Sequence, residues 1–445
     1  MRIPFRNVDA SWLRMDDPVN LMVVTGVLVL EAPVPLASLR DLVEKRLLGF
    51  RRFTSRVVPP FAGVGLPSWE PDPEFDLDRH LLVEKLGPGA GEPALQDMVS
   101  RLLSEPLPAG RPLWTIHLVE HFRGGSAIVA RIHHCIGDGL ALVHVLLSMA
   151  DGTPAPERRP RRPRASWEIA LGDQVLRAAR TLLDNPGRIG DLARLASGSA
   201  GSLIGLLALP DDPPTRLKGP LGRAKIAAWS RPFDLADVKA IGRATGSTVN
   251  DVLMAALAGA LRRSLVARGE APREMDVRGI VPVNLRRPEA AGRLGNRFGL
   301  VFLALPIGIE DPLDRLFETR RRMRALKDSP QALAIYQVLW AMGAAPRPIF
   351  DLALRIFAAK GTAVVTNVVG PKHEIAIAGA PLREAMFWVP SAGRLSLGVS
   401  LLSYAGKVWI GLQCDAAVIP DPAGVLAGFE AEVEALLDLR RQAGG

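Results

Sequence analysis

The sequence predicts a mixed α/β (α+β) protein with two lobes. Its 445 residues exceed the usual size of a single hydrophobic core, so two domains are expected. Strand-like and helix-like patterns alternate in both halves, and a stretch rich in proline and arginine separates them. We expect one lobe over residues 1–150, a connecting segment over 151–220 and a second lobe over 221–445, each lobe containing a mixed sheet. An active site is expected between the lobes, a common position for small-molecule sites.

In the first half, short apolar runs predict strands, and apolar residues at helical spacing predict helices. Strands are expected at residues 21–30, 114–119 and 127–132, and helices at residues 36–48 and 95–103. Residues 51–58 form a basic segment that leads into a further strand. Residues 7–17 are polar and mixed, and no regular element is predicted there.

The second half shows the same alternation, with capping residues at several helix ends. Gly246 ends a predicted helix over residues 235–245, residues 247–251 cap a helix over 252–265, and Asp421 caps the last helix over 423–437. Another helix is expected at 311–327. Strands are expected at 224–229, 277–284, 300–306 and 363–368, and a hairpin around residues 404–406 joins strands 395–403 and 407–414.

The charge balance favours an anionic partner. The formal net charge is +9, which suits a CoA-type phosphate ligand, an anionic membrane surface or nucleic acid. Aromatic residues make up only 5% of the chain and no nucleic-acid motif is present, so nucleic acid is not expected as a partner.

Cysteine usage and hydropathy predict a cytoplasmic protein. Cys135 and Cys414 lie far apart in the chain, and residues 1–12 lack the apolar core of a secretory signal. The longest apolar stretches, at residues 198–210 and 335–345, are shorter than the roughly 20 residues that span a bilayer. We therefore expect at most peripheral contact with a membrane.

The connecting segment allows two interpretations. Residues 151–164 alternate proline with charged residues and indicate a linker that cannot bury a core. Residues 167–195 show a basic amphipathic helical pattern and are followed by an apolar segment over 197–209. A basic amphipathic helix beside an apolar segment can also lie in the plane of a membrane surface.

The motif His133-His134-Cys135-Ile136-Gly137-Asp138-Gly139 is the strongest functional signal. It joins a predicted strand to a predicted buried helix, and its two glycines permit a sharp turn and close approach of a ligand to the backbone. Successive strand residues point to opposite faces, so the two histidines are not expected to share a metal ion. One histidine is expected to face a cavity as a base while the other supports it.

Several chemistries lose support because their motifs are absent. The sequence contains no G-x-S-x-G elbow, P-loop, G-x-G-x-x-G after a strand or H-E-x-x-H. Covalent serine catalysis, nucleotide hydrolysis, Rossmann-type hydride transfer and zinc hydrolysis are therefore not expected. The remaining histidines are interpreted as structural: His80, His117, His121, His144 and His373.

The pattern H-H-x-x-x-D-G resembles the signature of the CoA-dependent acyltransferase superfamily, which includes chloramphenicol acetyltransferase-like enzymes and the condensation domains of peptide synthetases. Further segments resemble one branch, the bacterial bifunctional wax ester synthase/diacylglycerol acyltransferases. These segments are residues 75–80, 112–114, 250–252, 281–286, 295–297, 367–371 and 403–406. Together they cover most of the chain.

The resemblance implies two chloramphenicol-acetyltransferase-like lobes with a tunnel between them, which a thioester enters from one face and an alcohol from the other. His134 would be the general base that takes the proton of the acceptor hydroxyl. Acyl transfer would be direct, with acyl-CoA as a co-substrate and with no bound cofactor or metal. Asn250 or a backbone N–H near Gly137–Gly139 would stabilise the oxyanion, an alternative that the sequence leaves open.

The resemblance also assigns supporting residues. Asp138 would pair with an arginine, with Arg56 or Arg52 as the expected partner, and His133 would orient the turn. Pro112, Trp114, Asn250 and Asp251 would form wall and scaffold, although Trp114 also fits a core aromatic and Asp251 a helix cap. Asn284 stands where many relatives have serine and Val369 where many have proline, which leaves the acceptor preference open.

The expected function is transfer of a long-chain acyl group from acyl-CoA to a fatty alcohol or diacylglycerol, giving wax ester or triacylglycerol plus CoA. One alternative is a related acyltransferase that takes its acyl group from an acyl-carrier protein. A second is a catalytically silent lipid-binding protein, against which the intact histidine motif argues.

Overall fold

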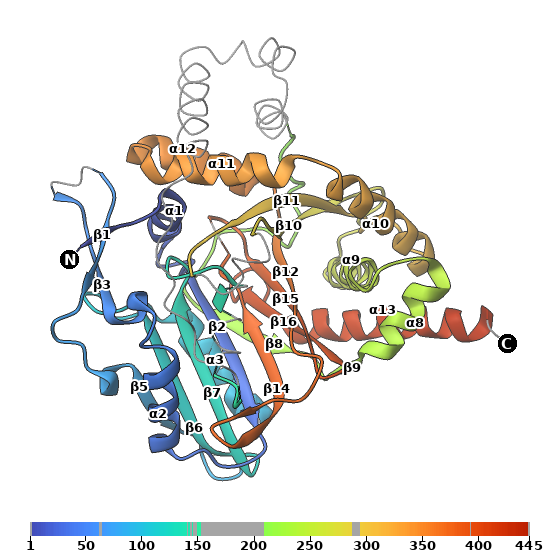
Figure 1. Cartoon of the computed structure of the whole chain (residues 1–445). Helices are drawn as coiled ribbons and strands as arrows, with labels where there is room; N and C mark the ends of the chain where they lie inside the picture. Colours follow the sequence, from blue (N-terminus) through green and yellow to red (C-terminus); the bar gives the residue numbers. More distant parts are fainter. Residues whose placement is uncertain are drawn as a thin grey trace.

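Two large sheets organise the part of the chain that the computed structural model describes, namely residues 2–61, 65–139, 141–142, 145, 149–152, 209–286, 294–391 and 393–443. One sheet is built mainly from the first half of the chain, and the other from the second half (Figure 1). Helices cover both, so the mixed α/β class predicted from the sequence is confirmed.

The first sheet has the strand order β13-β14-β2-β7-β6-β5. These strands are β2 (Val23–Leu30), β5 (Leu81–Lys85), β6 (Trp114–Phe122), β7 (Gly125–His133), β13 (Ala376–Ile377) and β14 (Ala380–Trp388). β5 runs parallel to β6 and the other pairs are antiparallel, so the sheet is mixed. Apolar side chains of α2 (Leu36–Arg46) and α3 (Glu92–Ser104) complete its core.

A small third sheet extends this lobe. It has the order β1-β4-β3 and consists of β1 (Ile3–Pro4), β3 (Ser55–Val58) and β4 (Ser68–Pro71). Two short 3-10 helices, Arg51–Thr54 and Leu77–Arg79, lie on either side of β3 and β4 in the chain.

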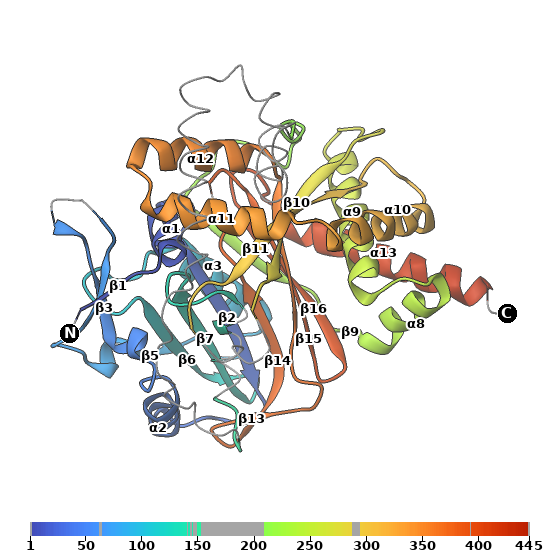
Figure 2. The ribbon, with the colours of Figure 1, turned by 45° about the horizontal axis from the view of Figure 1, so that its top comes forward.

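The second sheet has the strand order β11-β10-β12-β15-β16-β8, with β9 also paired to β16. These strands are β8 (Lys225–Trp229), β9 (Phe233–Asp234), β10 (Val277–Asn284), β11 (Phe298–Leu305), β12 (Ala363–Val369), β15 (Leu397–Tyr404) and β16 (Lys407–Asp415). One face packs against α8 (Leu235–Thr245), α9 (Val249–Ala267), α10 (Pro312–Lys327) and α13 (Pro422–Ala443). The opposite face is turned toward the first sheet, with β14 beside β15 and β16 (Figure 2).

The N-terminal helix α1 (Asn7–Met15) joins the two halves. It packs against α11 (Gln331–Ala344), which in turn contacts α12 (Arg347–Ala359) (Figure 2). Trp12 of α1 shares an apolar cluster with Leu339 of α11 and Phe298 of β11. The backbones approach closely at Gly343, where a Cβ atom would overlap the backbone of Asn7.

Most elements predicted from the sequence are present, with ends shifted by a few residues. Gly246 ends α8 with a φ of 63°, and Asp421 Oδ1 accepts the N–H of Gly424 at the start of α13, as expected. The elements that were not predicted are α1, α11, α12, β4, β5 and β14, together with the two-residue strands β1, β9 and β13.

Residues 376–388 lie in the sheet of the first lobe, although the expected boundary assigns them to the second lobe. They follow residue 221, yet their strands β13 and β14 complete the sheet of the first lobe by pairing β14 with β2. The rest of the partition at 150 and 221 stays a prediction. The proposed linker and amphipathic helix fall largely on residues 153–208, which lie outside the described residues.

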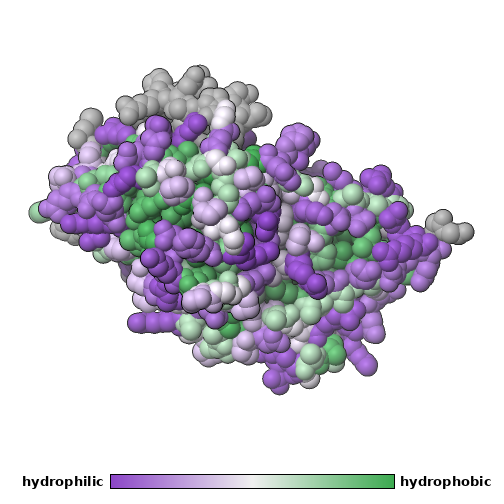
Figure 3. All heavy atoms as spheres, turned by 90° about the horizontal axis from the view of Figure 1, so that it is seen from below, coloured by the Kyte–Doolittle hydropathy of each residue, from purple (hydrophilic) through white to green (hydrophobic). Residues whose placement is uncertain are grey.

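Within the described residues, none of the helices is both long enough and apolar enough to cross a bilayer. The face seen from below carries mainly hydrophilic residues, with apolar ones in smaller patches between them (Figure 3). This mixture suits a face in contact with water.

We expect Gly343→Ala to destabilise the protein by about 1–3 kcal/mol, the usual cost of forcing extra atoms into a packed contact. The added methyl group must push α1 away from α11, because the backbone of Asn7 occupies its place. Urea denaturation measures the stability change. Gly49→Ala is the control, because a Cβ there meets no atom within 4 Å; equal losses in both variants would contradict the close approach.

Candidate active site

The histidine motif forms the predicted strand-to-helix corner. β7 ends at His133, which is paired with Val23 of β2, and the His134 N–H donates to the carbonyl of Met22 at 2.7 Å. A turn follows, and helical structure begins at Gly139. Gly137 and Gly139 are not among the residues with positive φ, so the corner does not require the left-handed backbone that glycine permits.

His134 is buried between aromatic rings. Its imidazole stacks on Trp12 with ring centroids 4.1 Å apart and an interplanar angle of 23°, and Phe298 lies 5.7 Å away. Only 4% of the residue is exposed, and Nδ1 has no hydrogen-bond partner among the described residues. The two neighbouring rings come from α1 and β11, so both halves of the chain enclose this side chain.

Burial lowers the pKa of His134 to about 4, because removing water penalises the charged imidazolium. The Asp138 carboxylate opposes this shift and the neighbouring His133 adds to it. The imidazole is therefore neutral near pH 7. A neutral imidazole can accept a proton, as a general base must.

His133 makes contacts that fit a supporting role. Its Nδ1 lies 3.1 Å from the backbone N of Cys135. Nε2 lies 3.6 Å from the carboxylate of Asp16, whose oxygen also accepts the Met22 N–H at 2.6 Å. Among the described residues, no group of histidine, cysteine and acidic side chains is arranged to hold a metal ion.

Asp138 is the centre of a buried hydrogen-bond network. Arg286 Nη1 lies 2.6 Å from both carboxylate oxygens, and 5% or less of either side chain is exposed. The backbone N–H groups of Ala141 and Arg297 donate to the carboxylate at 2.9 and 3.0 Å. Arg286 also donates to the carbonyl of Gly295. The carboxylate thus joins the motif turn to Arg286 and Arg297 of the second half.

The expected partners of Asp138 were wrong. Arg56 pairs with Glu70 at 3.3 Å on a partly exposed strand, and neither Arg56 nor Arg52 bonds to Asp138. The sequence alone could not identify Arg286, because its approach depends on how the two halves of the chain pack together. The segment containing Arg286 had nevertheless been marked by its resemblance to the family.

Arg52 still reaches the motif through the backbone. Its Nη1 donates to the carbonyls of Cys135 and Ile136 at 2.9 and 2.7 Å. Its Nη2 lies 2.6 Å from the carboxylate of Asp9, which is fully buried. Arg52 therefore fixes the motif turn against α1.

Asn296 connects the same parts from the second half. Its side-chain N–H group donates to the His134 carbonyl and to Asp9 Oδ1, each at 2.9 Å, and its backbone N–H donates to the same Asp9 oxygen at 3.0 Å. Sequence reasoning missed Asp9, Trp12 and Asn296 as site residues. Asp9 and Trp12 lie in the stretch that was interpreted as irregular, although Val8, Trp12 and Met15 have the spacing of an apolar helix face.

The other predicted site residues are structural neighbours of the corner or lie elsewhere. Pro112 is buried, and the fully buried Trp114 donates its indole N–H to the Phe53 carbonyl at 2.8 Å and stacks on His80, which fits the core interpretation. The exposed Asn284 accepts the Arg286 N–H at 2.9 Å, so it shapes the turn that presents Arg286.

Asn250 and Asp251 occupy the first turn of α9. Asp251 forms a capping box with Thr248, which confirms the helix-cap interpretation. Asn250 Oδ1 accepts the side-chain N–H of Asn367 of β12 at 2.9 Å, and no hydrogen bond joins Asn250 to the motif. Its role as an oxyanion donor therefore stays a prediction.

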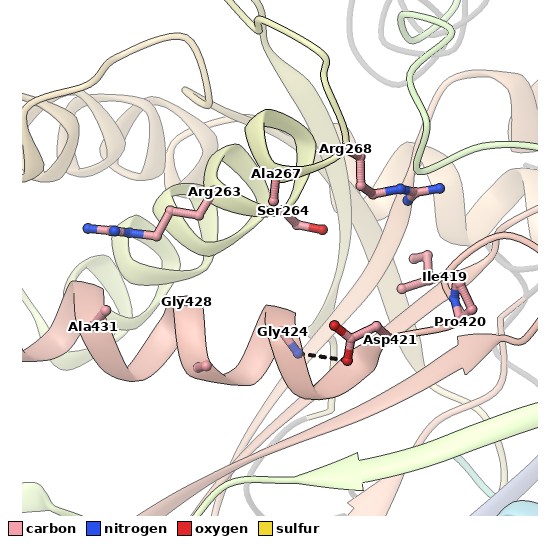
Figure 4. Close-up of a pocket in the computed structure, with 11 residues that line it drawn as sticks. Arg263, Ser264, Ala267, Arg268, Ile419, Pro420, Asp421, Gly424, Gly428 and Ala431 are labelled. Atoms are coloured by element: carbon pink, nitrogen blue, oxygen red, sulfur yellow. Dashed lines mark hydrogen bonds between the residues drawn. The ribbon is translucent and has the colours of Figure 1, made fainter.

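A pocket of about 400 Å³ lies between α9 and α13, on the far side of the second sheet from the motif (Figure 4). Arg263 and Arg268 stand near its ends, and small residues of α13 form its floor. Asp421 in its wall already accepts the Gly424 N–H. The lining of the pocket contains no histidine and none of the motif residues, so it is not the candidate active site.

Comparisons with known proteins agree with the motif. Residues 5–253 match the model of the wax ester synthase/diacylglycerol acyltransferase catalytic domain, and residues 294–437 match the C-terminal domain of the same family. The "Probable diacyglycerol O-acyltransferase" of Mycobacterium tuberculosis is 29% identical over 457 residues, covering 98% of this chain and 96% of that protein.

Solved structures share the fold. The wax ester synthase/diacylglycerol acyltransferase of Marinobacter aquaeolei VT8 is 22% identical, with a TM-score of 0.70 and coverage of 98% of this chain and 100% of that one. The first condensation domain of the calcium-dependent antibiotic synthetase is 18% identical, with a TM-score of 0.65 and coverage of 99% and 96%. The predicted two-lobed architecture is thereby confirmed.

We expect Arg286→Met to destabilise the protein by about 3–5 kcal/mol, because it leaves the buried Asp138 carboxylate without its cation. Arg56→Met is the matched control and should cost about 0–1 kcal/mol, since its ion pair with Glu70 is partly exposed. Urea denaturation of both variants measures the difference. A larger loss in Arg56→Met than in Arg286→Met would contradict the observed pairing.

We expect kcat/KM to decrease as the pH is lowered through about 4. The pKa of His134 is about 4, and a protonated His134 cannot accept a proton. An unfolded histidine titrates near pH 6.5, so as the pH decreases from about 6.5 to 4 the unfolded state binds the proton first and stability decreases. Rates measured from pH 4 to 8, with recovery of activity checked at pH 7, test this. A reversible midpoint near 6.5 would contradict it.

Proposed function

Because the chain belongs to the wax ester synthase/diacylglycerol acyltransferase family, we propose that it transfers a long-chain acyl group from acyl-CoA to a fatty alcohol or diacylglycerol. The products are wax ester or triacylglycerol, and CoA. The chain is an acyltransferase of this family, and the donor, the base and the acceptor are parts of the proposal. The observation that carries it is the buried, neutral His134 at the corner where the lobes meet.

The proposed reaction is direct transfer. As the acceptor hydroxyl oxygen bonds to the thioester carbonyl carbon, its proton moves to His134. The tetrahedral intermediate then breaks the carbon–sulfur bond, and the departing thiolate takes the proton from His134 to give the free thiol. Holding both substrates together lowers the barrier without an acyl-enzyme.

The surroundings of His134 support this role. Trp12 and Phe298 exclude water, and Asn296 holds the His134 carbonyl, so the ring is fixed before substrates arrive. Backbone N–H groups around residues 137–139 or the amide of Asn250 would bind the oxyanion. No metal or bound cofactor enters the proposed steps.

The proposed substrates suggest where the enzyme works. Long-chain acceptors partition into lipid, so we place the protein in the cytoplasm with peripheral contact to the inner membrane or lipid droplets. The net charge of +9 suits both an anionic lipid surface and the phosphates of CoA.

Purified protein should release free CoA thiol from palmitoyl-CoA when hexadecanol or dipalmitoylglycerol is supplied. His134→Ala should lower kcat by about 10²–10⁴-fold, the usual contribution of a general base. His373→Ala, an exposed histidine, is the control and should retain activity. Full activity in His134→Ala would exclude the proposed base. Activity with palmitoyl-acyl-carrier protein but not with palmitoyl-CoA would show that the acyl donor is the carrier protein and not acyl-CoA.

A further inference from the structure

Four buried polar side chains form a polar strip at the junction of the two sheets. They are Thr366, Ser391, Ser400 and Gln413. Each is between 2% and 6% exposed, and the three hydroxyl groups and Gln413 Oε1 have no hydrogen-bond partner among the described residues.

Strand register makes the polar strip continuous. Thr366 of β12 pairs with Ser400 of β15, and Gln413 of β16 pairs with Gly398 of β15. Residues 398 and 400 are two apart, so all of these positions share one face of the sheet. A Cβ atom at Gly398 would lie 3.3 Å from Ser391 Oγ, so the glycine leaves room beside that hydroxyl.

This face is turned toward the first sheet. The alternating residues Val365, Val399 and Leu412 pack on the opposite side with α9 and α13. On the face of the polar strip, a Cβ at Gly411 would lie 3.2 Å from Nε1 of Trp388, at the end of β14. The polar strip therefore lies between the sheets rather than under the helices.

The polar strip is close to the histidine motif and lies between two apolar clusters. Leu402 joins the core of the first lobe, and Leu395 joins the cluster that contains α1 and α11. A Cβ at Gly139 would lie 3.7 Å from Val389, whose carbonyl oxygen would lie 3.2 Å from a Cβ at Gly398. Val389 thus lies next to both the motif and this part of the polar strip.

Buried hydroxyl and amide groups nearly always have hydrogen-bond partners, because an unpaired one loses its interaction with water without compensation. Four neighbouring groups without partners indicate that something polar occupies this place in the working enzyme. A passage that received only hydrocarbon would be more stable with apolar side chains here.

We propose that the polar strip is a subsite for the carbonyl oxygens of a substrate, either the ester carbonyls of a diacylglycerol acceptor or the amide carbonyls of the pantetheine arm of CoA. The inference rests on the proposed function and deepens it. The three hydroxyl groups can donate to such oxygens, and Gln413 Oε1, which can only accept, suits the amide N–H groups that the pantetheine arm also carries. A fatty alcohol has no carbonyl, so its only oxygen is the one that reacts.

The test is the double variant Thr366→Val/Ser400→Ala in the full chain, assayed with dipalmitoylglycerol, hexadecanol and palmitoyl-CoA. If the polar strip binds glyceride esters, kcat/KM for dipalmitoylglycerol falls about 10–100-fold while that for hexadecanol is unchanged. If it binds pantetheine, both acceptors lose activity equally and KM for palmitoyl-CoA rises about 10-fold or more. Unchanged kinetics with all three substrates would overturn the proposal.

Two further measurements separate binding from folding. Because the replaced hydroxyls have no protein partner, the double variant should keep the wild-type Tm or exceed it, and a large drop in Tm would overturn the premise of the proposal. Ser403→Ala, on the other face of β15, is the control and should keep all three kinetic constants.

Failure of the proposed function would give a different result, because the wild type itself would release no thiol with either acceptor. Calorimetric titration with palmitoyl-CoA would then test whether the polar strip binds the pantetheine arm. Equal affinity of the wild type and the double variant for palmitoyl-CoA would overturn that binding.

Discussion

The buried charge of Asp138 determines how the two halves of the chain meet. Its carboxylate lies in the turn after β7, while Arg286 and the backbone N–H of Arg297 come from the second half. A carboxylate buried without such partners would be strongly unfavourable, so the fold that buries it must also bring Arg286 and Arg297 to the turn. Thus one electrostatic requirement positions the histidine corner and the contact between lobes together.

A second set of contacts works in the same direction. Asp9 receives hydrogen bonds from Arg52 and Asn296, and these two residues hold the carbonyls of the motif turn. The backbone on both sides of His134 is therefore held from α1, from the basic segment and from the second half. The imidazole lacks a hydrogen bond at Nδ1 and has a low pKa. The contacts of Asp9, Arg52 and Asn296 stabilise the fold and offset the unfavourable burial of this imidazole.

Local patterns in the sequence were sufficient for elements that carry their own signals. The hairpin of β15 and β16, the cap of α9 and the corner after β7 all have turn or capping residues in place. The histidine motif likewise identified the candidate site. Strand β14 was missed because its buried face becomes evident only against β2, which is hundreds of residues away. Helix α1 was missed because its many polar residues hide the spacing of Val8, Trp12 and Met15, which pack in the cluster that contains α11.

The partner of Asp138 was missed for a related reason. A basic strand entry at residues 51–58 was the nearest plausible source of an arginine, and Arg52 does contact the motif backbone. The choice between Arg52, Arg56 and Arg286 depends on tertiary distance, which spacing along one chain cannot provide.

Strand β14 has a consequence for how the protein is made. β2 is synthesised near the start of the chain, yet one of its two neighbours arrives only when residues 380–388 have left the ribosome. Until then β2 presents an unpaired apolar edge, the kind of surface that recruits other chains. Such long-range pairing also slows folding. The nascent first lobe is therefore the stage at which this protein is most exposed to aggregation and most dependent on chaperones.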